Sequence, residues 1–114
     1  MNTLESTTLT LNQRQALNVL RARLYNEFDV EKIILYGSAA RGQANADSDI
    51  DLLIVTTHPR TRQQQHQITD AVFEVNLEFD TTFSSLVVDR HEWMNGYSFL
   101  LLQDEILKDG IEVE

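Results

Sequence analysis

Two aspartates, Asp49 and Asp51, stand two residues apart at the start of an apolar run, where a carboxylate is costly to bury. On a strand, both side chains leave the same face. Two neighbouring carboxylates repel each other unless a cation lies between them. Mg²⁺ suits such a pair, because it takes carboxylate oxygens and commonly bridges a protein to substrate phosphates. Asp49 and Asp51 are therefore the candidate metal ligands.

A phosphate-binding turn is expected ten residues before this pair, at Gly37-Ser38. Glycine lets the backbone turn sharply and approach a ligand closely. Residues 39–41 (Ala-Ala-Arg) favour a helix start, whose N–H groups would hold a phosphate together with the Ser38 hydroxyl. Ser48, directly before the aspartates, would cap or orient one carboxylate. The segment therefore offers a phosphate cradle and a metal site, joined by a short loop.

Hydrophobic periodicity predicts the elements that position these residues. A capping box, Thr10 to Gln13, begins an amphipathic helix over residues 11–28. A second helix is expected from about 60 to 79, with Pro59 at its first position. A third helix is expected over residues 98–108; a turn at Asn95-Gly96 precedes it and Gly110 ends it. Strands are expected over residues 32–36, 49–55 and 83–88.

The order of these elements is helix, strand, strand, helix, strand, helix. It indicates an α/β (α+β) fold with a small mixed sheet of three to four strands flanked by helices. A length of 114 residues fits one domain, residues 1–114. The sequence has no cysteine, no apolar run near 18 residues and no secretory signal at its start, which favours a cytoplasmic protein without a membrane span.

The net charge of −9 is unevenly distributed. Residues 1–69 hold seven acidic and seven basic residues, whereas residues 70–114 hold eleven acidic and two basic ones. This distribution argues against broad nucleic-acid binding, which requires a basic surface. The acidic half would either keep the surface soluble or dock on a basic partner.

The pattern of these residues resembles the signature of a known family. Gly37-Ser38, ten residues and Asp49-Ile50-Asp51, between two β-type apolar runs, are similar to the signature of the nucleotidyltransferase superfamily that includes DNA polymerase β. The specific match covers residues 33–55. The size resembles the minimal nucleotidyltransferases (MNT), which in prokaryotes often pair with a helical HEPN-domain protein, some as toxin–antitoxin couples.

The resemblance implies a role for each matching residue. Gly37 and Ser38 would hold the triphosphate of a nucleotide, and Asp49 and Asp51 would bind Mg²⁺. Arg41 would reach a phosphate, an exposed structural arginine being the alternative. The reaction would transfer a nucleoside monophosphate, AMP from ATP, to a hydroxyl, with a HEPN-type partner protein as the acceptor and this chain as its antitoxin. The oligomeric state, including a homo-oligomer, stays open.

One part of the family pattern is missing. Family enzymes place a third carboxylate on the next core strand, yet residues 83–88 (Phe-Ser-Ser-Leu-Val-Val) contain no acid. Glu78, Asp80 and Asp89 flank this strand, and Asp80 is the best substitute among them because its loop could fold back. The alternative function is a non-catalytic nucleotide-binding or partner-binding subunit.

The segment near the third expected helix is apolar. Its residues around Trp93, Met94, Tyr97 and Phe99 would be core, lid or partner surface.

Overall fold

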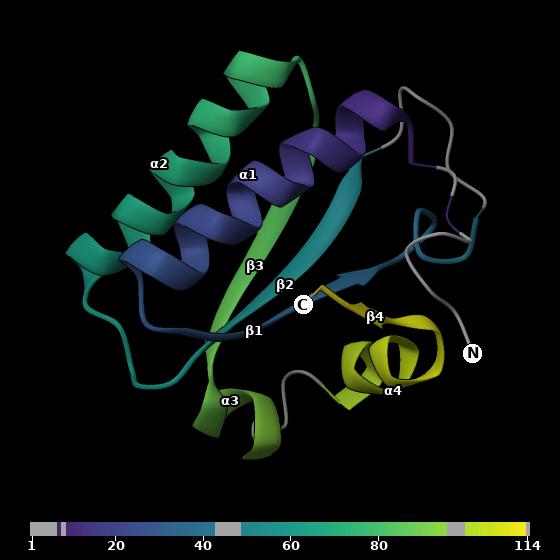
Figure 1. The fold of residues 1–114 in the computed structure, drawn as a ribbon. Coiled ribbons are helices and arrows are strands. Elements are labelled where there is room, and N and C mark those ends of the chain that lie inside the picture. Colours follow the sequence, from purple (N-terminus) through teal and green to yellow (C-terminus); the bar gives the residue numbers. More distant parts are fainter. Residues whose placement is uncertain (1–6, 8, 43–48, 96–99, 114) are drawn as a thin grey trace.

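The computed structural model describes residues 7, 9–42, 49–95 and 100–113, without the side chains of residues 100 and 101. The helices and strands follow one another along the chain in the order that the hydrophobic pattern predicts, with two additions (Figure 1). The helices are α1 (Leu11–Glu27), α2 (Arg62–Phe79), α3 (Arg90–Asn95) and α4 (Leu100–Asp109). The strands are β1 (Val30–Tyr36), β2 (Ile50–Thr56), β3 (Phe83–Asp89) and β4 (Ile111–Glu112).

The four strands form one mixed sheet in the order β3-β2-β1-β4. Strand β1 is antiparallel to β2 and to β4, whereas β2 and β3 run parallel. The two central strands, β1 and β2, each have neighbours on both sides. The predicted α/β fold with a small mixed sheet flanked by helices is confirmed.

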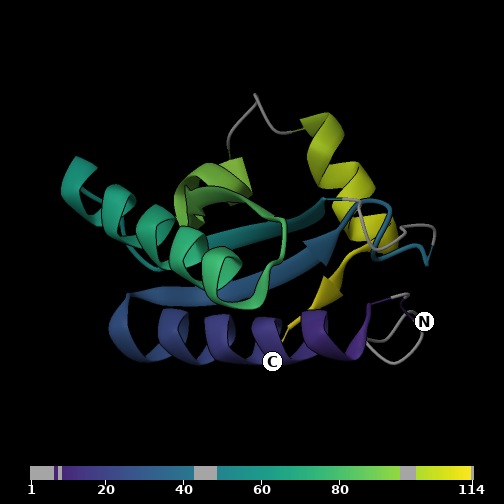
Figure 2. The same ribbon diagram turned by 90° about the horizontal axis from the view of Figure 1, so that it is seen from above.

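Helices cover both faces of the sheet (Figures 1 and 2). α1 and α2 lie side by side on one face, over the larger core, which contains Leu20, Leu52 and Val72. α3 and α4 cover the other face, where Leu53, Trp93 and Ile106 belong to a second, smaller core. The alternation along β2 is direct: Leu52 faces one core and Leu53 the other. No helix among the described residues is long and apolar enough to cross a membrane.

The start of α2 differs from the prediction. The helix begins at Arg62 with Thr61 as N-cap, so Pro59 precedes it and is not its first residue. The Thr61 hydroxyl accepts from the Gln64 backbone, and the Gln64 side chain accepts from the Thr61 backbone. This reciprocal capping box fixes the start, because it satisfies two N–H groups that a start at proline would leave unpaired.

Three shorter segments also differ. The residues after Gly37, expected to begin a helix, form consecutive turns up to Gly42. α3 and β4 were not predicted, because six and two residues are too short to show a hydrophobic period. The expected turn at Asn95-Gly96 is replaced on its described side by the last residue of α3, and Gly96 lies outside the described residues.

Candidate active site

The antiparallel pairing of β1 and β2 brings the two halves of the sequence motif together. Tyr36, the last residue of β1, lies opposite Asp51 in β2. Gly37 follows Tyr36 and begins the turn, whereas Asp49 directly precedes β2. Residues separated by more than ten positions in the sequence are therefore neighbours at one end of the sheet.

Gly37 is required at its position for two reasons. Its φ of +76° lies in the left-handed region, which strains residues with a side chain. In addition, a Cβ at Gly37 would lie 2.5 Å from the Asp51 Oδ2 atom. The backbone of the turn therefore packs directly against the carboxylate. The turn itself is held by a hydrogen bond of 3.2 Å from the Arg41 N–H to the Gly37 carbonyl.

The two aspartates have different environments. Asp49 is exposed, whereas Asp51 is half-buried. Burial raises the pKa of the Asp51 carboxyl, and the negative charges of Asp49 and Glu105 raise it further, while Arg41 lowers it. Asp51 therefore has more negative than positive charges near it. Such an arrangement favours a bound cation.

Two further residues at this end of the sheet were not among the predicted site residues, Tyr36 and Glu105. The pKa of the Tyr36 hydroxyl is raised by burial and by the charges of Asp51 and Glu105. Glu105, in α4, accepts from the Arg41 guanidinium at 3.2 Å. No sequence signal points to Glu105, because it lies 64 residues from Arg41. Tyr36 could have been noted as the residue directly before Gly37-Ser38.

Strand β3 carries Ser84 opposite Asp51, so a hydroxyl occupies the position on the neighbouring strand that is closest in register to the aspartate. Asp89, a flanking acid, lies opposite Thr56 at the far end of the sheet, where it caps α3. Asp80 is the left-handed C-cap of α2, which covers the opposite face. Among the residues that the structure describes, no three His, Cys, Asp or Glu side chains form a group that could hold a metal.

Comparison with known proteins identifies the family. Residues 14–109 match the family model of the nucleotidyltransferase domain. The chain belongs to this family. The nucleotidyltransferase assignment made from the residue pattern is thereby confirmed. A candidate protein adenylyltransferase from Methanocaldococcus jannaschii is 29% identical over 84 residues, which cover 74% of this chain and 79% of that protein.

Solved structures share the fold of this nucleotidyltransferase. A toxin–antitoxin structure with AMP-PNP has a TM-score of 0.57 at 15% identity and covers 85% of this chain and 70% of its own. A complex of the tri-AMPylated Shewanella oneidensis HEPN toxin with its MNT antitoxin has a TM-score of 0.52 at 14% identity, with coverage of 90% and 71%. At these identities the similarity concerns the fold.

The aspartate pair of the nucleotidyltransferase fits a divalent cation. Asp49 and Asp51 offer carboxylate oxygens two positions apart in the chain, and the half-buried Asp51 carboxylate has acidic neighbours. With two protein carboxylates, a Mg²⁺ ion would take its remaining oxygens from phosphates and water, which is how this ion is commonly bound. Ser48, expected to orient a carboxylate, lies outside the described residues.

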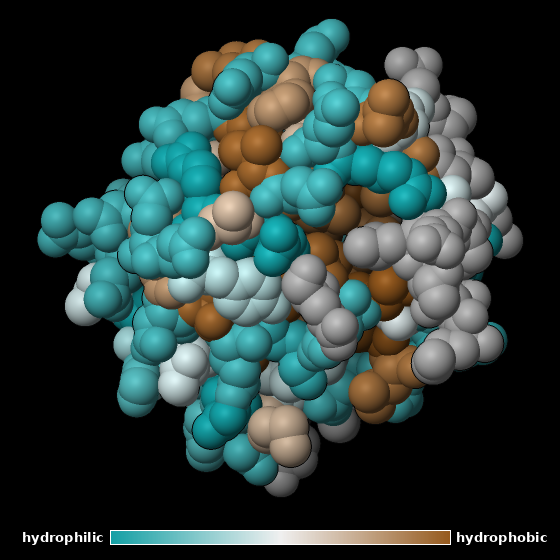
Figure 3. Space-filling model, in the orientation of Figure 1, coloured by the Kyte–Doolittle hydropathy of each residue, from teal (hydrophilic) through white to brown (hydrophobic). Residues whose placement is uncertain are grey.

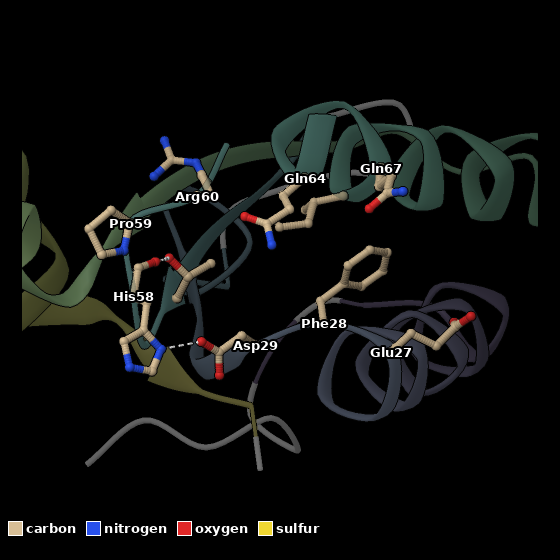
Figure 4. A pocket seen from close by; sticks show the side chains of 10 residues that line it. Glu27, Phe28, Asp29, His58, Pro59, Arg60, Gln64 and Gln67 are labelled. Carbon is tan, nitrogen blue, oxygen red and sulfur yellow. Dashed lines mark hydrogen bonds and ion pairs between the residues drawn. The ribbon is translucent and has the colours of Figure 1, made fainter. Parts of the chain in front are cut away.

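A cavity of about 450 Å³ lies elsewhere in the molecule. It is lined by residues from the end of α1, the end of β2 and the start of α2, including Phe28, Asp29, His58 and Gln67 (Figure 4). The His58 Nδ1 and Asp29 Oδ2 atoms lie 2.6 Å apart at its rim. Asp29 precedes β1 and His58 follows β2, so the cavity is at the opposite end of these strands from Asp51. The cavity is therefore separate from the Gly37 turn and the two aspartates.

Proposed function

We propose that the protein is a Mg²⁺-dependent nucleotidyltransferase that transfers AMP from ATP to a hydroxyl of a HEPN-type partner protein and thereby acts as its antitoxin. The observation that carries the proposal is the contact between the Gly37 turn and the Asp51 carboxylate. This contact joins a backbone suited to phosphate with a carboxylate suited to a cation. The bound metal would neutralise phosphate charge and lower the barrier to attack at phosphorus.

The residues of the chain would act by binding and orientation. The backbone of Gly37 and Ser38 would hold the triphosphate, with Ser48 and Arg41 as further contacts. Asp49 and Asp51 would hold the metal. The acceptor oxygen would then form a bond to the α-phosphorus while the bond to the β-phosphate breaks, releasing pyrophosphate and the hydroxyl proton. Positioning of this kind supplies much of the rate enhancement in phosphoryl and nucleotidyl transfer.

A protein acceptor is supported by charge and by relatives. The excess of acidic residues after position 70 disfavours nucleic acid as acceptor. A relative from Methanocaldococcus jannaschii is itself a candidate protein adenylyltransferase, and a structural neighbour is an MNT antitoxin with its AMPylated HEPN toxin. AMP as the transferred group and HEPN as the partner come to this chain from these proteins.

The test uses purified protein, Mg²⁺ and ATP labelled at the α-phosphate, with and without a HEPN-domain protein as the proposed partner. Label is expected on the partner, and it should vanish in the double variant Asp49→Asn/Asp51→Asn. Both substitutions remove a negative charge while keeping the side-chain shape, so folding should persist. Labelling that survives in the double variant would show that these aspartates are not the metal site.

A second candidate function is a non-catalytic subunit that binds nucleotide or partner. The observation that favours it is Ser84, where the register places a hydroxyl beside Asp51 on β3. This function predicts Mg²⁺-dependent ATP binding by calorimetry together with no transfer of label to any partner.

A further inference from the structure

One acidic residue outside the sequence motif lies close to the aspartate pair. Glu105 belongs to α4, which lies on the face of the sheet opposite α1 (Figure 2). Asp51 stands two positions before Leu53, a residue of the smaller core on this face, so the Asp51 side chain leaves β2 on the same face. Its neighbour Ile106 is 2% exposed and anchors the helix in the smaller core. Directly after α4, β4 pairs with β1, where Ile111 lies opposite Leu35. A buried side chain and a strand pairing therefore fix the position of Glu105 relative to the end of β1.

Glu105 forms an ion pair with Arg41, which connects it to the proposed site. The Arg41 Nη1 and Glu105 Oε1 atoms are 3.2 Å apart, and these side chains are 33% and 48% exposed. Arg41 lies in the turn that follows Gly37, so the ion pair joins α4 to the proposed phosphate-binding turn. Consistent with this placement, the Glu105 charge contributes to the raised pKa of both Asp51 and Tyr36.

The simplest alternative is that Glu105 only forms a surface ion pair. An exposed pair of this kind contributes little to stability. That explanation does not account for the location of Glu105, since its ion pair holds Arg41 in the same turn whose Gly37 backbone packs against the Asp51 carboxylate. A third negative charge near Asp49 and Asp51 opposes folding unless a bound cation compensates for it.

We infer that Glu105 is a positioning residue of the cation site, which supplies a third negative charge from α4 and holds Arg41 over the phosphate-binding turn. The inference rests on the proposed function, because it assumes a metal–nucleotide complex at the aspartate pair. Since the described acids do not form a three-residue metal group, Glu105 acts through charge and through Arg41, and not as a direct ligand.

The test measures binding of Mn²⁺, as a probe for the divalent cation, and of a non-hydrolysable ATP analogue, by calorimetry. Glu105→Gln should weaken Mn²⁺ binding in the presence of the analogue about tenfold, the effect expected of an outer-shell partner. Asp104→Asn is the matched control, because it removes the same charge from an exposed position of the same helix. It should change the affinity less than twofold. Circular dichroism checks that each variant is folded.

A second variant asks whether the charge itself matters. Ser84 lies opposite Asp51 on β3, so Ser84→Asp places a carboxylate beside the pair from another element. In the Glu105→Gln background this change should restore most of the lost Mn²⁺ affinity. The inference is overturned if Glu105→Gln behaves like Asp104→Asn. It is also overturned if Glu105→Gln tightens binding of the analogue and leaves Mn²⁺ binding unchanged, because Glu105 would then only withhold Arg41 from phosphate.

Failure of the inference and failure of the proposed function give different results. If the parent protein binds Mn²⁺ with the analogue and Asp49→Asn/Asp51→Asn does not, the proposed site stands whatever Glu105→Gln does. If the parent and the double aspartate variant bind equally, the proposed site is wrong and the role of Glu105 is overturned with it.

Discussion

At the scale of single residues, the site depends on one close approach, that of the Gly37 backbone to the Asp51 carboxylate. The approach is allowed only because residue 37 has no side chain, and it leaves Asp51 half-buried among other acids. Two predictions at this scale separate the steric and the electrostatic parts of the contact.

Gly37→Ala should destabilise the protein by more than the cost of a positive φ alone. The added Cβ must displace the Asp51 side chain, so a loss of about 1–3 kcal/mol is expected. Gly42→Ala, at a φ of +70°, is the matched control for the backbone effect. Urea unfolding measures both. The excess loss at Gly37 should shrink in an Asp51→Ala background, and an unchanged excess would contradict the steric explanation.

Asp51→Asn should stabilise the protein without metal at pH 7. The folded-state pKa of Asp51 is raised, so its ionised form opposes folding, and this cost disappears as the pH falls through that pKa. The gain should be at most about 1 kcal/mol, because solvent screens a half-buried carboxylate. Unfolding is measured at pH 7 and at mildly acidic pH with EDTA. A variant that is less stable than the parent at pH 7 would refute this account.

At the scale of elements, short polar networks set where β3 begins and ends. Asn76 in α2 accepts from the Phe83 N–H at 2.9 Å through its side chain and donates to the Phe83 carbonyl at 3.0 Å. It also accepts from the Thr81 hydroxyl at 2.9 Å. At the other end, Asp89 caps α3. These contacts fix the register that places Ser84 beside Asp51.

Asn76→Ala should cost about 1–3 kcal/mol, since it leaves polar groups at the start of β3 unpaired. Asn12→Ala is the control, because the Asn12 side chain makes an exposed hydrogen bond to the Phe79 carbonyl. Chemical denaturation of both variants tests this prediction. Equal losses would show that the Asn76 network does not fix the strand.

Asp89→Ala should cost about 1–2 kcal/mol at neutral pH through loss of the α3 cap. The Asp89 carboxylate accepts from the Glu92 backbone N–H at 2.8 Å, and this bond lowers the pKa of Asp89. A lowered folded-state pKa stabilises the fold above the ordinary pKa of aspartate, and this contribution is lost as the pH falls through the lowered value. Asp89→Asn keeps the cap without the charge, so its loss should be smaller than that of Asp89→Ala at neutral pH. This loss should also vanish as the pH falls through the lowered pKa of Asp89, because the parent then loses the same contribution. A loss in Asp89→Asn that does not change with pH would assign the pH dependence of the parent to another group.

At the scale of the whole molecule, exposed apolar side chains occur on both layers. On the α1 and α2 layer, hydrophobic residues are interspersed with hydrophilic ones (Figure 3). Phe73 and Leu77 of α2 are exposed. On the α3 and α4 layer, Met94 and Leu107 are exposed, whereas Trp93 is buried in the smaller core. Of the aromatic residues expected to be core, lid or partner surface, Tyr97 and Phe99 lie outside the described residues.

If a partner presents its hydroxyl to the aspartate pair, it should contact the α3 and α4 layer, which lies on the same face of the sheet as the Asp51 side chain. Leu107→Asp in α4 should therefore weaken the partner complex at least tenfold, since truncating or charging an interface anchor has effects of this size. Phe73→Asp in α2 introduces the same group on the opposite layer and should have little effect. Titration calorimetry with the proposed HEPN-type partner compares the two variants. A stronger effect from Phe73→Asp would place the partner on the α1 and α2 layer.

The sequence by itself determined the local features. The helices α1 and α2, the strands β1 to β3 and the Gly37–Asp51 motif carry periodic or turn signals within a few residues, so each could be predicted where it stands. The capping boxes at Thr10 and Thr61 are equally local, although Pro59 is the more conspicuous signal for the start of α2 in the sequence.

Only the tertiary structure decided which of these features meet. The antiparallel β1–β2 register places Gly37 against Asp51, the parallel β2–β3 register places Ser84 beside it, and the packing of α4 brings Glu105 to Arg41. Contacts over such sequence distances depend on how whole elements pack, and no period or motif within one element encodes them. The residue types of the proposed metal site were therefore readable in the sequence, whereas the charge balance around them was set by the fold.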